Sequence, residues 1–132
     1  MSVTIVRLGS PRRRGEGLRI GTVRRPPRGV PKKQWARRDY FDVWYSVLAP
    51  SAKLMRATRA AHAGRDEQKV WKTFTRKYRA EMAQPGASRT LDVLAALSHT
   101  ANFSVGCYCE DERWCHRGIL RKLLAERRAK VR

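Results

Sequence analysis

The sequence predicts an α/β fold, with a small and mostly parallel sheet flanked by helices, in a single domain over residues 1–132. Two observations lead to this prediction. The chain opens with short β-prone runs, its middle has helical patterns, and a last β-prone run leads directly into a helix, an order typical of α/β proteins. A length of 132 residues also suits one domain with a substantial core.

Three stretches before the first predicted helix have the composition of strands. Val3–Leu8 and Leu18–Val23 are short and rich in aliphatic residues, and the glycines and proline between them predict a turn. Phe41–Val47 alternates large residues and fits either a third strand or a short helix. Residues 24–33 hold three prolines and five positive charges with no acidic residue, so we expect a basic loop there.

Two helices are predicted in the middle of the chain. The first runs from Lys53 to His62 and is expected to end near Gly64. Asp66 can cap the second helix, and Pro85-Gly86 is expected to end it. Large apolar residues recur at every fourth position of the second helix, which predicts a stripe in the core. The stripe consists of Val70, Phe74, Tyr78 and Met82, with Trp71 beside them.

The last third of the chain predicts a helix, a strand and a final helix. Ser88 offers a cap for a helix from Thr90 to about Thr100. Phe103–Cys109 is apolar and β-prone, which predicts a buried strand. Aliphatic residues then recur at helical spacing, and they are Ile119, Leu120, Leu123 and Leu124.

The chain is strongly basic, since thirty Lys and Arg residues against eleven Asp and Glu residues give a net charge of +19. This charge is more than solubility requires, and it predicts a polyanionic partner, with nucleic acid, either DNA or RNA, as the first candidate. The alternative is that the basic residues only solvate the surface. The residues expected to contact phosphates are those of the basic loop: Arg24, Arg25, Arg28, Lys32 and Lys33.

The sequence also predicts the cellular location of the protein. No run approaches the roughly 18 apolar residues of a membrane span, and the first residues lack the plan of a signal peptide. We therefore expect a cytoplasmic protein with no membrane partner. Three cysteines packed within nine positions do not form a secreted disulfide framework, so we expect free thiols or metal ligands. The sequence leaves the oligomeric state open.

All three cysteines lie where the last predicted strand passes into the last helix. At such a junction the free backbone N–H groups and the helix dipole favour anions and lower thiol pKa values. Functional groups of open α/β sheets gather at the carboxyl ends of strands. We therefore predict one pocket with a thiol, a proton acceptor or ribose ligand, and donors to an anion. Its candidate catalytic residues are Cys109, Glu110, Cys115, His116 and Arg117.

The same segment has three other interpretations. Cys107 and Arg113 have the spacing of a phosphatase loop, but the three carboxylates between them would repel a phosphate. The cysteines and His116 also suit zinc, but three features of the sequence oppose it. A C-x-C pair within a strand splays to opposite faces, the usual spacing of two to four residues between paired ligands is absent, and the adjacent Cys115 and His116 rarely chelate one ion. We therefore expect no bound metal and no cofactor. In the third interpretation, Cys107 and Cys115 are simply small buried apolar residues. If a thiol is activated, we expect Cys109 or Cys115 to be alkylated before Cys107.

Here the chain resembles a known family. Cys109-Glu110 and Cys115-His116-Arg117, followed by an aliphatic helix, resemble the C-terminal signature of the domain-of-unknown-function family 488, while Cys107 lies outside this shared pattern. The predicted strand Leu18–Val23 with the basic loop after it, and the segment Leu48–Arg56, resemble the YeaO-like branch. The resemblance spans nearly the whole chain. It implies an α/β fold, a bacterial or archaeal cytosolic protein, and a site at the cysteine segment without a defined reaction.

Overall fold

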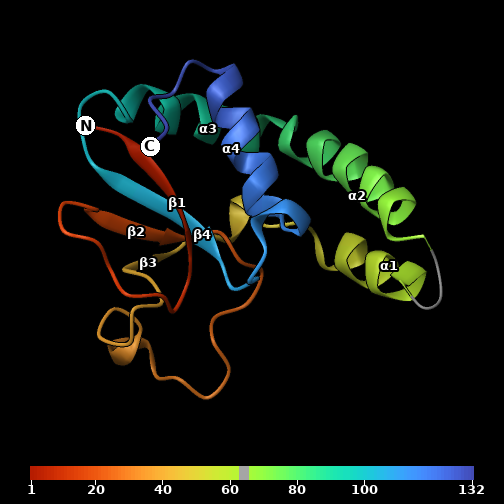
Figure 1. Ribbon diagram of the computed structural model, residues 1–132, viewed down its shortest axis with the longest axis horizontal. Coiled ribbons are helices and arrows are strands. Elements are labelled where there is room, and N and C mark those ends of the chain that lie inside the picture. Colours follow the sequence, from red (N-terminus) through yellow and green to blue (C-terminus); the bar gives the residue numbers. More distant parts are fainter. Residues whose placement is uncertain (63–65) are drawn as a thin grey trace.

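The computed structural model describes residues 1–62 and 66–132, and it confirms the predicted α/β fold (Figure 1). Parallel strands form a four-stranded sheet in the order β1-β4-β2-β3, with helices packed against it. The strands are β1 (Val3–Arg7), β2 (Leu18–Gly21), β3 (Val43–Trp44) and β4 (Phe103–Cys107). The α-helices are α1 (Ala52–His62), α2 (Glu67–Met82), α3 (Pro85–Leu97) and α4 (His116–Glu126).

β4 is the centre of the sheet because it pairs with both β1 and β2. All five of its residues are buried, and Phe103 is in register with Val3 of β1. Successive side chains of a strand point to opposite faces of the sheet. Phe103 and Val105 therefore join the core beneath the helices, whereas Ser104 points to the other face, in register with Arg19 of β2.

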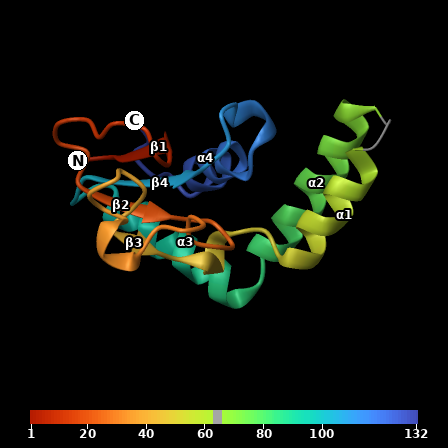
Figure 2. The ribbon, with the colours of Figure 1, turned by 90° about the horizontal axis from the view of Figure 1, so that it is seen from below.

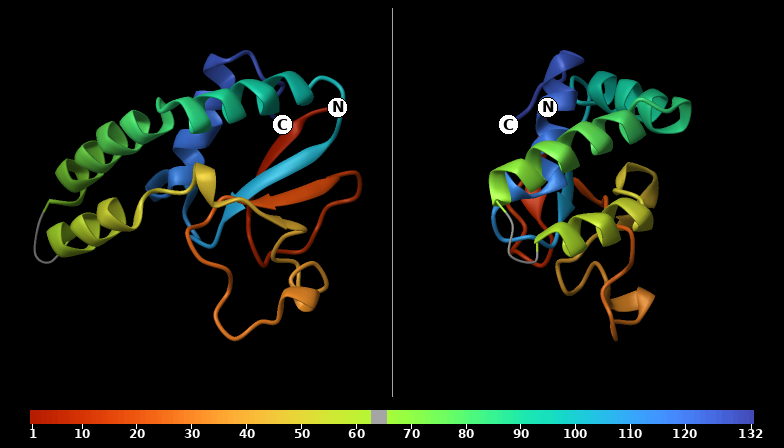
Figure 3. Two further views of the ribbon diagram at one scale, coloured as in Figure 1. Left: turned by 180° about the vertical axis from the view of Figure 1, so that it is seen from behind. Right: turned by 90° about the vertical axis from the view of Figure 1, so that its right-hand side faces the viewer.

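The helices cover one face of the sheet (Figures 1 and 2). α4 packs on β1 and β4, and both α2 and α3 pack against α4. The predicted stripe of α2 is confirmed, since Val70, Phe74, Tyr78 and Met82 are all buried. α1 and the outer part of α2 form a hairpin that extends beyond the sheet, as the view from behind shows (Figure 3). None of the helices in residues 1–62 and 66–132 is long and apolar enough to cross a membrane.

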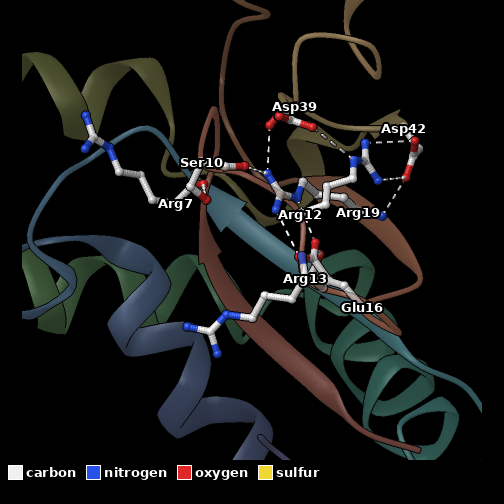
Figure 4. A network of polar contacts seen from close by, with 9 residues as sticks. Arg7, Ser10, Arg12, Arg13, Glu16, Arg19, Asp39 and Asp42 are labelled. Atoms are coloured by element: carbon white, nitrogen blue, oxygen red, sulfur yellow. Dashed lines mark hydrogen bonds and ion pairs between the residues drawn. The ribbon is translucent and has the colours of Figure 1, made fainter.

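The opposite face is covered by loops and holds an ion pair between Arg19 and Glu16 (Figure 4). Both side chains are buried, and the Arg19 Nε and Nη2 atoms donate to the Glu16 carboxylate at 2.7 and 3.0 Å. The Nη1 atom of Arg19 donates to the backbone oxygens of Ser10 and Asp39 at 2.9 and 2.7 Å. Ser104 of β4 also donates to Glu16, at 2.7 Å. This network joins two loops to the two central strands.

The outer edge of β1 is covered by the last residues of the chain, so that the two termini lie close together (Figure 1). The Val3 N–H group donates to the Lys130 oxygen at 2.9 Å, and the Arg132 N–H group donates to the Val3 oxygen at 2.8 Å. Val131 forms an isolated parallel bridge with Val3. These bonds satisfy backbone groups that an open sheet edge would leave unpaired.

The third strand is much shorter than the predicted span Phe41–Val47, because β3 contains only Val43 and Trp44. Phe41 turns inward instead and is fully buried. Its ring packs so closely on Gly21 of β2 that a Cβ at this position would overlap with it. The inward turn of Phe41 keeps the strand from starting earlier.

Three other predicted boundaries are wrong. β2 ends at Gly21 and not at Val23. α3 begins at Pro85 and not after Ser88, because proline is well suited to the first position of a helix, where its missing N–H group costs nothing. β4 ends at Cys107 and does not continue to Cys109. The predicted helix end near Gly64 lies outside the described residues.

We expect the Glu16→Gln variant to unfold about 3 kcal/mol more easily at pH 7, because it leaves the buried Arg19 charge without its partner. Burial opposes ionisation of Glu16, but the hydrogen bonds from Arg19 and Ser104 prevail and lower its pKa from 4.5 to about 2. The stability that ionised Glu16 contributes is therefore complete above pH 4.5 and is lost as the pH falls toward 2. Urea unfolding at several pH values measures both effects, and the variant should lack this part of the acid slope.

A matched control is Glu126→Gln, which removes the exposed ion pair between Arg79 and Glu126. Exposed pairs contribute about 1 kcal/mol at most, so this variant should unfold much like the natural chain. Equal losses in the two variants would contradict the importance given to the buried pair.

Candidate functional site

A cleft of about 820 Å³ opens at the carboxyl ends of β2 and β4, between the sheet and the α1–α2 hairpin. Its walls come from the segments after the two strands, the turn before α4, and the facing sides of α1 and α2. Open α/β sheets hold their functional groups at this edge. The cleft therefore lies where the sequence predicted a site.

The three thiols form a cluster in the inner wall of the cleft. Their Sγ atoms all lie within 4.8 Å of one another, and those of Cys107 and Cys109 are 3.8 Å apart. Cys107 ends β4 and Cys115 is the N-cap of α4; both are buried, whereas Cys109 is exposed. Because β4 ends at Cys107, Cys109 lies in the turn beyond it, and strand alternation does not force its side chain to the opposite face.

The cluster favours a single thiolate, on Cys109. Hydrogen bonds from the Cys107 and Cys115 thiols lower the pKa of Cys109 well below its usual range, and they outweigh partial burial, which opposes ionisation. The same contacts raise the pKa of Cys107 to about 11 and hold the pKa of Cys115 far above its usual value. The positive charge of Arg117 acts in the same direction on Cys109. Of the three thiols, Cys109 therefore loses its proton most readily.

His116 is neutral at pH 7, because burial lowers its pKa to about 4. Its Nε2 atom lies 2.6 Å from the backbone oxygen of Thr22. Since a carbonyl oxygen only accepts hydrogen bonds, Nε2 carries the proton and Nδ1 keeps a free electron pair. The Nδ1 atom lies 4.0 Å from the Sγ atom of Cys115. The ring therefore presents an acceptor to the thiol cluster.

The turn that carries the thiols is held at both ends. The buried Arg117 donates from Nη2 to the backbone oxygens of Cys109 and Glu110 at 2.9 and 3.2 Å. Among the described residues, its Nε atom has no hydrogen-bond partner. At the other end, Gly118 lets α4 approach the backbone of Glu112, where a Cβ would collide with the carbonyl oxygen. The positions of Cys109 and Cys115 thus depend on α4.

The structure brings together most of the predicted catalytic residues. Cys109, Cys115 and His116 line the cleft, and Arg117 supports the turn from behind. Glu110 does not join them: its side chain is 83% exposed and its carboxylate lies 3.5 Å from Arg7. Of the two thiols expected to react first, Cys109 is exposed and Cys115 is buried. Cys115 is only 2% exposed, and its neighbours raise its pKa.

The predicted basic loop is only partly at the cleft. Arg24 and Arg25 line it, but the guanidinium of Arg24 donates to the backbone oxygens of Ala49 and Pro50, both at 3.0 Å. Arg24 therefore braces the segment before α1. The remaining basic residues of the loop are exposed and lie outside the cleft lining, and they are Arg28, Lys32 and Lys33.

Several residues of the cleft are absent from the predicted site, and four of them are arginines or tryptophans. Arg56 and Arg59 line it from α1, Trp71 from α2, and Trp114 from the turn before α4. The spacing of Arg56 and Arg59 places them on one face of a helix, and the sequence contains this signal. The packing of α1 against α2 decides which way that face points, and the spacing of residues in the sequence does not predict this packing. Trp71 was assigned to the core, and it does pack partly against it.

In the reduced, chelator-treated protein, we expect iodoacetamide to modify Cys109 at least about tenfold faster than the other two cysteines. The reason is access, since Cys109 is exposed while Cys107 and Cys115 are buried. Peptide mass spectrometry over a time course measures the three rates. The Cys109→Ala variant is the control, and only slow labelling should remain in it. Fast labelling of either buried cysteine in the folded protein would contradict the arrangement.

The chain was also compared with known proteins. A family profile described as the active DUF488-N3 subclade matches residues 3–128. No curated protein and no solved structure gives a significant match. The matched span runs from β1 through the α4 helix, so it includes the sheet, the cleft and the thiol cluster. It agrees with the resemblance seen in the cysteine segment. The chain therefore belongs to the DUF488 family.

Proposed function

We propose that the chain recognises, or acts on, nucleic acid or a nucleotide in the thiol-lined cleft. The observation that supports this proposal most directly is the lining itself: cationic and aromatic side chains share one cleft with the three thiols. Phosphates and bases are bound by these two kinds of side chain. The net charge of +19 suits such a polyanionic ligand.

Exposed guanidinium groups would bind the phosphates. Arg56 and Arg59 lie one turn apart on α1, and Arg25 lies on the opposite wall. All three are exposed, whereas Arg24 is engaged with backbone oxygens. Guanidinium groups suit phosphate because their planar N–H fork matches two of its oxygens.

Aromatic rings would bind the base. Trp114 is 46% exposed, and its ring packs edge-on against Trp71, with centroids 5.9 Å apart. Tyr108, between two of the cysteines, also lines the cleft. An exposed indole offers a flat face to any base, and such stacking contributes about 1–3 kcal/mol per base. A volume of about 820 Å³ is in the range of pockets for ligands of nucleotide size.

We expect a labelled single-stranded oligonucleotide to bind in a salt-dependent way, with a log-log slope of about 0.7 per phosphate contacted. The Arg56→Ala/Arg59→Ala double variant should bind about tenfold more weakly and with a lower slope. Fluorescence anisotropy at several salt concentrations measures both quantities. The control is Arg76→Ala/Arg89→Ala, which removes the same charge from exposed positions outside the cleft. Equal weakening in both, or no complex at ~50 mM salt, would refute the proposal.

The Trp114→Ala variant separates stacking from charge. It should weaken binding by about tenfold while leaving the salt slope unchanged, because an indole neutralises no phosphate. The same anisotropy titrations give this result. A change in slope without loss of affinity at low salt would show that Trp114 acts through the arrangement of charges and not through a base.

A further inference from the structure

The thiol cluster has the spacing of a metal site. Zinc binds thiolates at about 2.3 Å, and tetrahedral angles then place two sulfurs roughly 3.8 Å apart. The Sγ atoms of Cys107 and Cys109 are 3.8 Å apart, and the Sγ atom of Cys115 lies within 4.8 Å of both. One objection drawn from the sequence, that a C-x-C pair in a strand splays apart, does not apply because β4 ends at Cys107.

His116 is arranged like a zinc ligand. A ligating histidine normally donates its second ring N–H group to a carbonyl or a carboxylate, which fixes the ring and leaves the other nitrogen for the metal. In His116, Nε2 is bonded to the Thr22 oxygen at 2.6 Å, and Nδ1 lies 4.0 Å from the Cys115 sulfur. Cys115 and His116 are the N-cap and first residue of α4, so the helix start holds both together.

The surroundings suit a metal–thiolate centre with one net negative charge. The Arg117 guanidinium is buried against the backbone of Cys109. Donors of this kind stabilise charge on coordinated sulfur.

We propose that Cys107, Cys109 and Cys115 bind one zinc ion. His116 is the fourth ligand in this proposal. Its Nδ1 atom lies 4.0 Å from the Cys115 sulfur but outside the group of atoms within 4.8 Å of one another, so its ring has to move toward the cluster when zinc binds. The ligand set has the soft thiolates and imidazole that zinc prefers, and it has no carboxylate. The proposal is independent of nucleic-acid binding. A zinc ion at this place would tie the end of β4 to the start of α4, and a ligand in the cleft would face a metal–thiolate wall.

The test uses the full chain, reduced and treated with a chelator. Zinc is titrated in competition with a chromophoric chelator, and Co²⁺ is added in a parallel experiment. We expect one zinc ion per chain, and for Co²⁺ the visible absorption of a tetrahedral site with thiolate-to-cobalt charge transfer. Zinc should also protect Cys109 from iodoacetamide. Binding well below one ion per chain, an octahedral Co²⁺ spectrum, or unprotected Cys109 would overturn the proposal.

Cys109→Ala is the decisive variant, because this side chain is exposed and its loss leaves the core packed. Its zinc affinity should fall at least about 100-fold, while circular dichroism stays unchanged. The control is Tyr108→Phe, between two ligands and unable to coordinate, which should bind zinc like the natural chain. Unchanged affinity in Cys109→Ala would overturn the site. An unchanged Co²⁺ spectrum in folded His116→Gln would overturn the fourth ligand.

Discussion

The buried guanidinium of Arg19 imposes the main constraint on this fold. A buried charge is tolerated only when it is paired and hydrogen-bonded, and here the partners come from Glu16 and from the backbone of Ser10 and Asp39. Each partner lies on a loop that must close over the sheet to reach it. Ser104 connects the same carboxylate to β4. The network thus adds a buried side-chain link between β2 and β4, whose backbones pair over four residues, and it fixes two loops over them.

Much of the fold could be predicted from the sequence because its strands and helices have clear periodicity. The stripe of α2 and the burial of β4 follow directly from apolar spacing. The errors are at places where a tertiary contact decides. The inward turn of Phe41 against Gly21 shortens β3, and this contact joins residues twenty positions apart. Pro85 was taken as the end of a helix, although proline also begins helices, and the pattern alone does not separate these uses.

The residues of the cysteine segment could be predicted from the sequence, whereas the cleft residues that come from α1 and α2 could not. Cys109, Cys115, His116 and Arg117 lie on one strand–turn–helix unit, so local chain geometry is enough to bring them together. Glu110 is in the same turn but faces Arg7, because a turn does not keep the alternation of a strand. Arg56 and Trp71 reach the cleft from the α1–α2 hairpin. Their positions depend on how that hairpin packs against the sheet, and no short sequence pattern contains this information.

The pairing of β1 with the last residues has a consequence for how the protein behaves in a crowded solution. Unpaired strand edges are templates on which other chains can add, and sheets that leave them long and flat tend to associate. Here the β1 edge is occupied by Lys130–Arg132, and the opposite edge, β3, has only two residues. A foreign strand would find almost no backbone groups with which to form a ladder. Adding a strand at either side of the sheet would therefore gain few backbone hydrogen bonds.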